Sequence, residues 1–291
     1  MAARRFTVIT GGVFGDAPGF DGAGLADTDA RPMESWSIDL CRPGQVVPEA
    51  EAAWRAVLTR TGVSDPFADP DYLQAAARHG AGGREVVFAL AWGRTGARRT
   101  LCGAIPLTIP NPMWGHGRIG PWQPYGCAVT PAVEAPHGDA VQAALLAHLR
   151  TLRRGASLDL ALAAPATRPV LRPVPDAVRI PAHNLLDVGG AGASSRERIV
   201  APDRIRDAVE EFLILDAAHA AAPIIGDPSE AALVRVVTRL FARRRQAAVD
   251  LTRRDGRVVA AALHLGTGPH AVVWRRASEG MAGTARLDRS A

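Results

Sequence analysis

The acidic side chains most suited to proton transfer lie in the last third of the chain. Glu210, Glu211 and Asp216 fall within one helical stretch, where a carboxylate could act as a general acid or base. Glu210 and Glu211 are adjacent and therefore face apart on a helix, since only residues three or four apart share a face. A solvated helix face is the first interpretation of this group, and acid–base chemistry is the alternative.

Other chemical motifs are weak. The eight histidines and three cysteines form no HxxxH, HExxH or Cys/His pattern with metal-ligand spacing, so no metal site is expected. Ser194 and Ser195 fall in a Gly/Ser-rich stretch, 189–197, that is interpreted as a linker and could not hold a nucleophile. Gly11–Gly15 faintly resemble a dinucleotide loop, but Pro and Gly follow where that loop needs a helix, so a nicotinamide-dependent enzyme is an outside alternative.

Composition indicates a folded protein of about two domains. The chain has 291 residues, of which 47% are apolar and 22% charged. It contains no apolar run of the ~18 residues that would span a bilayer, and its first apolar run is too short for a signal peptide. Three separated cysteines suit a reducing compartment, so a cytoplasmic protein is expected.

The net charge of +5 raises the question of an anionic partner. Every basic residue is arginine, and the chain is rich in Ala, Gly and Pro, which indicates GC-rich coding rather than a selected basic surface. Ten arginines lie between Arg235 and Arg276, against only Asp250 and Asp255. This stretch could bind an anion, but a nucleic-acid partner is not expected, because no lysine- and aromatic-rich groove is present.

The elements that must position these residues follow a repeated order. Residues 1–34 are expected to form a mobile extension, and the first half then predicts strand, helix, helix, strand and strand over Ser35–Leu40, Pro48–Thr61, Pro70–His79, Glu85–Trp92 and Thr100–Ile109. A loop at 110–137, a helix at Asp139–Arg153, a strand at Leu158–Leu162 and a Pro-rich segment at 164–181 come next.

The second half predicts the same order again, in His183–Val188, Pro202–Leu215, Pro228–Arg245, Ala247–Thr252 and Arg257–Leu265, with one more strand at His270–Ala277. Asp227 is the expected N-cap of the second of these helices. The order over 35–109 and 183–265 indicates an internal duplication, which divides the chain into domains at 35–181 and 182–291.

The strand–helix–helix–strand–strand order is the front half of the GNAT acyltransferase fold. Three segments, Glu210–Asp216, the helix ending in Phe241-Ala-Arg-Arg and the sheet Val249–Arg275, resemble the cellulose-biosynthesis acetyltransferases, the CelD/BcsL-like branch. The first half matches more loosely, at Trp54, Pro66-Phe67, Asp71-Tyr72-Leu73, Ile105-Pro106-Leu107 and Tyr125. The resemblance covers about 35–280 and implies an α/β fold: tandem GNAT-like mixed sheets flanked by helices, with the second repeat incomplete.

This resemblance implies acyl transfer from acetyl-CoA to an amine or hydroxyl of a small-molecule or polysaccharide/cell-envelope precursor. A backbone N–H would polarise the thioester carbonyl, and a carboxylate or water would take the proton. It places Trp274, Arg275 and Glu279, the one remaining acid, near the acyl-donor cleft, and Tyr125 at the inter-domain groove. The alternative interpretations are core for Trp274, solvated strand face for Arg275, loop for Glu279 and domain packing for Tyr125.

The sequence also departs from the family. Ala217–Ala222 replace the Gly-Trp-Lys-Gly stretch that usually follows the first helix, and Ala291 comes about 14 residues after the last strand, before any pyrophosphate-binding helix. The two matches to the pyrophosphate signature, Gln123–Ala128 and Arg253–Gly256, are interpreted as chance. An open edge at strand 270–277 therefore predicts self-association or marginal stability. The alternative function is an inactive remnant that binds a partner or anion through Arg235–Arg276.

Overall fold

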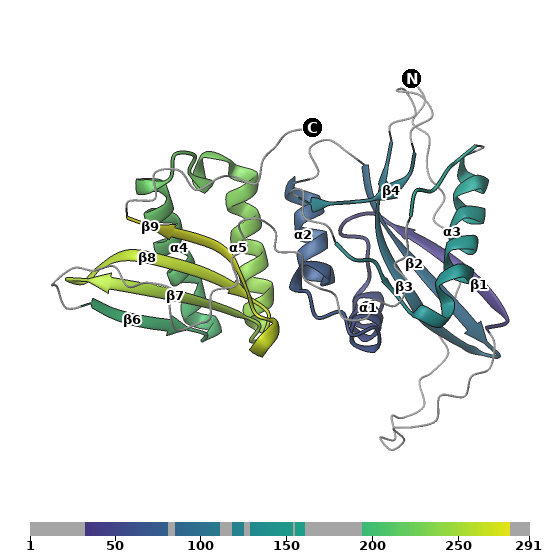
Figure 1. The fold of residues 1–291 in the computed structure, drawn as a ribbon, viewed down its shortest axis with the longest axis horizontal. Coiled ribbons are helices and arrows are strands. Elements are labelled where there is room, and N and C mark those ends of the chain that lie inside the picture. Colours follow the sequence, from purple (N-terminus) through teal and green to yellow (C-terminus); the bar gives the residue numbers. More distant parts are fainter. Residues whose placement is uncertain are drawn as a thin grey trace, which may run out of the picture. The chain divides into compact units, whose positions relative to one another are not determined.

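The computed structural model describes residues 33–80, 85–110, 118–124, 129–153, 155–160 and 194–279 (Figure 1). Within these ranges the chain has a mixed α/β fold with two antiparallel sheets, each flanked by helices, so the predicted fold class is confirmed. The predicted strand His183–Val188 and the Pro-rich segment 164–181 lie outside the described residues, as does nearly all of the predicted extension.

The first sheet is built around one long hairpin. Its strands pair in the order β1-β2-β3-β4, and β5 also pairs with β3. The strands are β1 Ser35–Cys41, β2 Glu85–Thr95, β3 Arg98–Ile109, β4 Gly120–Pro121 and β5 Ala132–Val133. The short strands β4 and β5 fall in the stretch predicted to be loop throughout. The side chains of β2 and β3 are buried continuously from Val86 to Ala91 and from Leu101 to Leu107, because helices cover both faces.

Two separate apolar clusters lie on the two faces of this sheet. Helices α1 (Pro48–Arg60) and α2 (Pro70–Gly80) contribute to the first, where the rings of Trp54 and Phe88 meet edge to face. Helix α3 (Gly138–Leu152) contributes Val141, Leu145 and Leu149 to the second, against the intervening residues of β2 and β3.

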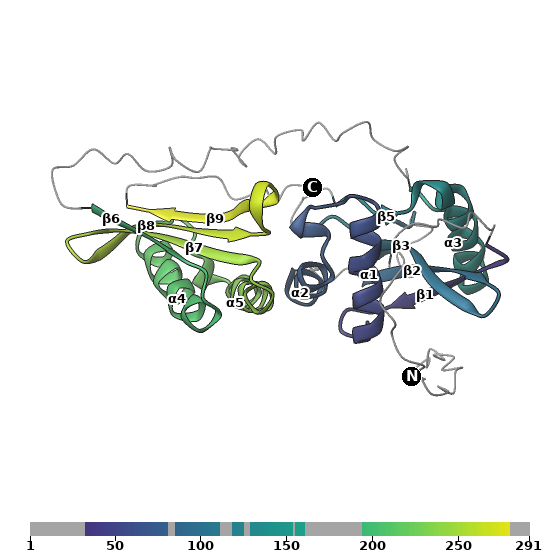
Figure 2. The same cartoon turned by 90° about the horizontal axis from the view of Figure 1, so that it is seen from below.

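The second sheet repeats the order of the first without a described counterpart of α3. Its strands, in the order β6-β7-β8-β9, are β6 Ser194–Ile199, β7 Ala247–Arg254, β8 Arg257–Leu265 and β9 Val272–Ser278. Figure 2 shows its helices, α4 (Pro202–His219) and α5 (Pro228–Arg243), on one side of the sheet. The order strand–helix–helix–strand–strand therefore occurs twice, as predicted.

Strand β6 corrects the expected linker. Ser194–Ile199 pairs with β7 along its whole length, from Ser194 opposite Arg254 to Ile199 opposite Val249. The sequence hides this strand because five of its six residues are polar. Only Ile199 enters the core and provides an apolar anchor.

The boundaries of α5 follow from its sequence. The Asp227 carboxylate accepts hydrogen bonds from the backbone N–H groups of Ser229 (3.0 Å) and Glu230 (3.3 Å), which confirms the predicted N-cap. Leu233, Val237 and Phe241 are buried in the core as expected. No helix among the described residues is long and apolar enough to cross a membrane.

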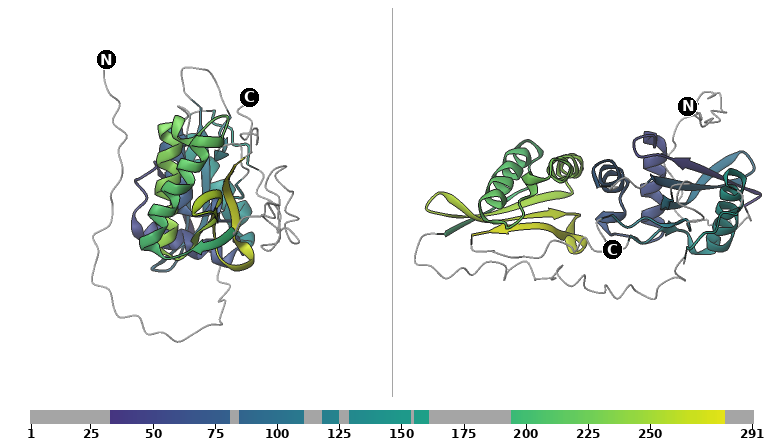
Figure 3. Two further views of the ribbon diagram at one scale, coloured as in Figure 1. Left: turned by 90° about the vertical axis from the view of Figure 1, so that its left-hand side faces the viewer. Right: turned by 90° about the horizontal axis from the view of Figure 1, so that it is seen from above.

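Figure 3 shows the green helices of the second half again on one side of its sheet. Helix α5 contacts α2 of the first half. At this contact the Arg244 guanidinium lies 2.8 Å from Asp69 and 3.0 Å from Asp71. Arg55 of α1 reaches Asp71 at 2.9 Å, so two arginines share the two carboxylates. Asp69 also caps α2 by accepting the Asp71 backbone N–H at 2.9 Å, so the ion pairs are attached directly to a helix terminus.

Candidate active site

Trp274 and Arg275 lie at an irregularity in β9. Leu263 of β8 faces Arg275 and His264 faces Val273, so Trp274 is an extra residue in β9 without an opposite partner in β8. Such a bulge turns two consecutive side chains toward one face of a sheet and interrupts the backbone hydrogen bonding. This explains why both Trp274 and Arg275 contact helices on the same side.

The surroundings of these two residues are well defined. Trp274 is 7% exposed, and its ring meets Tyr72 of α2 edge to face at 6.0 Å. The Arg275 guanidinium lies 5.1 Å from the Trp274 ring and 3.4 Å from the Glu230 carboxylate at the start of α5. The interpretation of Trp274 as core is confirmed, whereas Arg275, with a side chain only 19% exposed, is not on a solvated strand face.

Glu279 lies apart from this pair. It follows β9, its backbone N–H donates to the Val259 carbonyl at 2.9 Å, and its exposed carboxylate lies 3.7 Å from Arg257. Arg275 and Glu279 are four positions apart along the chain, which is about 13 Å at the usual rise of a strand. The structure therefore brings Trp274 and Arg275 together without Glu279. Tyr125 lies outside the described residues, as does most of the Gln123–Ala128 motif.

The fold brings together a second pair that the sequence analysis missed. Asp250 of β7 and His264 of β8 are diagonal neighbours across the two strands, and His264 Nε2 lies 3.0 Å from Asp250 Oδ2, at an angle outside that of a hydrogen bond. Their side chains are 6% and 11% exposed. Val249 and Leu251 point into the core with α4 and α5, so Asp250 points to the opposite face. His264 faces the same way, and it lies opposite Val273, beside the bulge.

Two arginines and a threonine complete this face. We call the set the polar face: Arg196, Arg198, Asp250, Thr252 and His264. Arg196 lies 3.2 Å and Arg198 3.4 Å from the Asp250 carboxylate. Burial raises the pKa of Asp250, but His264, Arg198 and Arg196 outweigh burial and hold that pKa below its ordinary value. Asp250 is therefore ionised, and the Thr252 hydroxyl beside it is buried without a hydrogen-bond partner among the described residues.

Comparison of the two sheets shows that this polarity is specific to the second. In the first sheet the corresponding face carries Ile38, Ala89 and Ala91, packed against α3. In the second, Arg198 and Asp250 stand opposite each other, as Ile38 and Ala91 do. Because buried charge is costly unless it is paired, a face built this way suits a polar ligand better than an apolar helix.

The sequence held a faint signal for this pair. Asp250 lies between Val249 and Leu251, and His264 lies between Leu263 and Leu265. This alternation is typical of a strand with one apolar and one polar face. The neighbouring small residues Ala248, Ala260 and Ala262 are the only further hint, because they leave room beside the polar side chains. Asp250 and His264 are 14 positions apart in the sequence, so their contact becomes visible only when the register of the two strands is known.

The acids of α4 have specific partners. Glu210 and Glu211, with side chains 42% and 35% exposed, lie on the solvated face as interpreted, whereas Asp216 is buried. Glu210 accepts two hydrogen bonds from Arg235, at 2.7 and 2.8 Å, and these lower its pKa. Glu211 pairs with Arg253 at 2.7 Å. Asp216 is buried, which raises its pKa, and it accepts the Ile224 backbone N–H at 2.6 Å. These carboxylates therefore hold the helix in place.

Half of the arginines in the stretch Arg235–Arg276 form ion pairs with carboxylates of the described residues. These five of the ten are Arg235, Arg244, Arg253, Arg257 and Arg275. The Arg253–Gly256 match to the pyrophosphate signature is the β7–β8 turn, where Asp255 and Gly256 have φ of 52° and 78° and a strand follows. Without a following helix this turn lacks the usual geometry of a pyrophosphate site.

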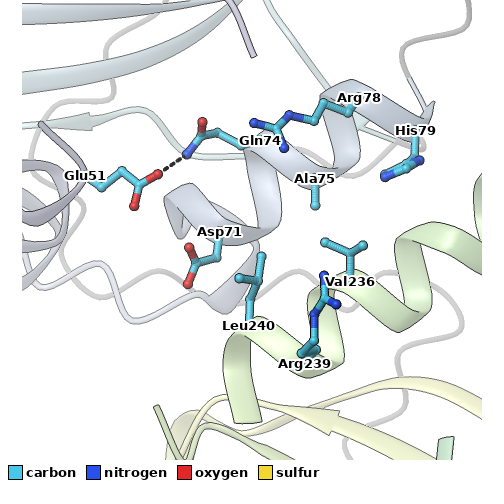
Figure 4. A pocket seen from close by; sticks show the side chains of 9 residues that line it. All are labelled: Glu51, Asp71, Gln74, Ala75, Arg78, His79, Val236, Arg239 and Leu240. Atoms are coloured by element: carbon cyan, nitrogen blue, oxygen red, sulfur yellow. Dashed lines mark hydrogen bonds between the residues drawn. The ribbon is translucent and has the colours of Figure 1, made fainter. Parts of the chain in front are cut away.

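A cavity of about 290 Å³ lies where α2 meets α5 (Figure 4). Gln74 projects into it and donates a hydrogen bond of 2.6 Å to Glu51. Val236 and Leu240 of α5 line the cavity, and Val236 also packs against the apolar core. Acidic residues line one side of the cavity, and Arg78 and Arg239 line the other. The cavity therefore favours neither an anionic nor a cationic ligand.

The element order and the two helix-flanked sheets define a tandem α/β protein in which the order strand–helix–helix–strand–strand occurs twice. No family model matches the chain, and no curated protein matches it. Among solved structures, the chain is similar to a tandem GNAT protein from the clavulanic acid biosynthesis pathway, solved without AcCoA. The identity is 15%, the match covers 84% of this chain and 80% of the other, and the TM-score is 0.37. Because that score is low, the fold assignment rests on the strand order.

Proposed function

We propose that the chain is a GNAT-type acyltransferase that uses His264, oriented by Asp250, as its general base. The observation that carries this proposal is the buried His264–Asp250 pair beside the bulge at Trp274. A base and a backbone irregularity in adjacent strands supply the two parts that acyl transfer needs, which are a proton acceptor and a donor for the carbonyl oxygen.

The chemistry follows from these positions. The Asp250 carboxylate next to Nε2 favours a proton on that nitrogen, which leaves Nδ1 as the proton acceptor. An acceptor amine or hydroxyl attacks the thioester carbonyl carbon while Nδ1 takes its proton. The tetrahedral oxyanion is held by a backbone N–H freed at the bulge. The C–S bond then breaks, the carbonyl re-forms, and the leaving thiolate receives the proton from His264.

Acetyl-CoA is the proposed acyl donor. The described residues suit the thioester end of such a donor, because β9 is an edge strand with a bulge. They suit its nucleotide end less well, because the Arg253–Gly256 turn lacks the geometry of a phosphate site. Trp274 and Arg275 would support this strand from the helix side, through Tyr72 and Glu230. Glu279 remains a second candidate base at the end of the same strand.

The acceptor is proposed from the resemblance to the CelD/BcsL-like branch. It would be a small molecule or a precursor of a polysaccharide or the cell envelope, carrying a free amine or hydroxyl, and it would be acylated in the cytoplasm. Arg196 and Arg198, at the rim of the polar face, favour an acceptor with a negative group. The proposed domain division is an extension at 1–34, a first domain at 35–181 and a second at 182–291.

Thiol release measures this activity whichever compound is the acceptor. Purified protein is incubated with acetyl-CoA and a panel of amines and hydroxyl compounds, with and without acidic groups, while free CoA thiol is followed with a chromogenic disulfide. We expect His264→Ala to lower the rate by about 10²–10⁴-fold, the usual contribution of a general base. His148→Ala, on the outer part of α3, is the matched control. An unchanged rate in His264→Ala would overturn the assignment of the base.

The alternative function is a catalytically inactive protein that binds an anion or an anionic partner. The clustering of arginines, with Arg198 beside Asp250 and ten more in the stretch Arg235–Arg276, is the observation that favours it. Steep loss of polyanion binding with rising salt, with no CoA release from any acceptor, would support this alternative, because phosphate contacts release counterions.

A further inference from the structure

Three side chains that are far apart in the sequence meet beside the first sheet. Cys102 lies within β3, Glu134 directly follows β5, and His137 ends the short 3-10 helix η4 (Ala135–His137) before α3. The Cys102 sulfur, a carboxylate oxygen of Glu134 and a ring nitrogen of His137 all lie within 4.8 Å of one another. We propose that Cys102, Glu134 and His137 bind one divalent transition-metal ion, and that zinc is the best match.

The backbone holds these three residues in place. The Glu134 backbone N–H donates to the Cys102 carbonyl at 2.9 Å, which continues the pairing of β5 with β3. The His137 backbone N–H donates to the Glu134 carbonyl, also at 2.9 Å. The ring of Trp36 from β1 packs edge to face on His137 at 5.4 Å. The donor atoms are therefore presented by fixed elements, as a metal site requires.

Arg60 of α1 orients the carboxylate. Its Nε donates to Glu134 Oε1 at 2.5 Å, and its second donor reaches the Leu101 carbonyl at 2.6 Å. This leaves the other oxygen, Oε2, on the side of His137, 3.7 Å from Nε2. A carboxylate that shares its two oxygens between a guanidinium and a metal ion is an ordinary outer-shell arrangement.

The donor set selects the metal. Thiolate, imidazole and carboxylate together suit zinc or cobalt, whereas magnesium and calcium prefer oxygen ligands alone. Zinc–ligand bonds of about 2.0–2.3 Å place tetrahedral donors about 3.5 Å apart, so the three donor atoms need to approach by about 1 Å. Rotation of the three side chains can bring the donor atoms closer by that amount. Because a tetrahedral ion has four ligands, three protein ligands leave the fourth position for a water molecule.

Binding must release a proton. Cysteine binds a metal ion as the thiolate, so the Cys102 thiol has to lose its proton when the ion binds. On binding, the S–H bond breaks, the sulfur–metal bond forms and the proton passes to solvent, with no change of oxidation state. Metal affinity should therefore rise with pH. The bound ion would fasten the start of α3 to β3.

Cobalt titration of the untagged full chain tests the site. We expect one equivalent of Co²⁺ to give visible bands of a tetrahedral ion together with a near-ultraviolet sulfur-to-cobalt charge-transfer band, both of which Zn²⁺ abolishes. Cys102→Ser should lose the charge-transfer band, and His137→Ala should weaken binding at least about 10-fold. The matched controls are Cys41→Ser, on β1, and His148→Ala, at a half-buried position of α3, and both should titrate as the unmodified protein does.

Thermal melts without metal show whether each variant is folded. In the unmodified protein Zn²⁺ should raise Tm, and in folded Cys102→Ser it should not. If Cys102→Ser melts without a transition, folded His137→Ala decides by the same two measurements. An absence of the charge-transfer band in the unmodified protein, or binding that both variants retain unchanged, would overturn the proposal.

Discussion

His264 Nε2 lies 3.0 Å from Asp250 Oδ2, on the face of the second sheet opposite α4 and α5. The two residues are diagonal neighbours on adjacent strands, and His264 also lies opposite the bulged part of β9. In the first sheet this face is apolar and packs against α3. The second sheet thus keeps the strand order of the first and replaces one apolar face with a paired acid and base.

Asp250→Asn tests the role of the carboxylate. The amide is neutral, so it stabilises neither the required tautomer nor the protonated imidazole, and we expect the rate of CoA release to fall by about 10²-fold or more. Glu279→Gln, at the exposed end of β9, should leave the rate within a few-fold of the unmodified protein. The reverse ranking would assign the base to Glu279, as the family resemblance implied.

Acid unfolding should report the same carboxylate. The folded protein holds the pKa of Asp250 below its ordinary value, so the unfolded chain binds more protons in the window from that lowered pKa up to about 4. Stability therefore rises with pH through this window, is fully present above it and is lost on acidification. Denaturant melts of Asp250→Asn should show a smaller pH slope than those of the unmodified protein. Equal slopes in the two proteins would contradict the assignment.

Arg244→Ala should weaken the contact between α5 and α2. The substitution leaves Arg55 alone to balance the negative charges of Asp69 and Asp71. It also removes the guanidinium that lies 4.9 Å from the Phe241 ring. We expect a loss of about 3 kcal/mol in the free energy of unfolding, the lower end of the range for removing one partner of a buried pair. Arg243→Ala, exposed on the same turn, should cost about 0.5 kcal/mol. Similar costs for the two variants would show that the contact contributes little.

The edge strand β9 predicts association. Within the described residues β9 pairs only with β8, so its other edge presents backbone donors and acceptors to a partner. Light scattering across a concentration series should show a growing oligomer fraction, and the melt should broaden as the chain is diluted. A sharp monomer peak at all concentrations, with a cooperative melt, would contradict this prediction.

The sequence predicted the elements better than it predicted the site. The boundaries of β8 were correct and those of α1, α2 and α5 were right to within two residues, because Pro at the helix starts, Gly after strands and the Asp227 cap act locally. The polar strand β6 was missed, because its partner is more than 50 positions away. The same limit hid Asp250–His264 and Cys102–Glu134–His137, since only strand register brings these residues together.

The direct test of acyl-CoA dependence is a thermal melt with and without about 1 mM acetyl-CoA. At a concentration one hundred times Kd a ligand stabilises the fold by about 2.7 kcal/mol, a rise of several degrees in a protein of this size. We expect such a rise, and free adenosine bisphosphate should reproduce part of it. A cooperative melt that neither ligand moves would contradict acyl-CoA binding by this chain, and with it the proposed transferase activity.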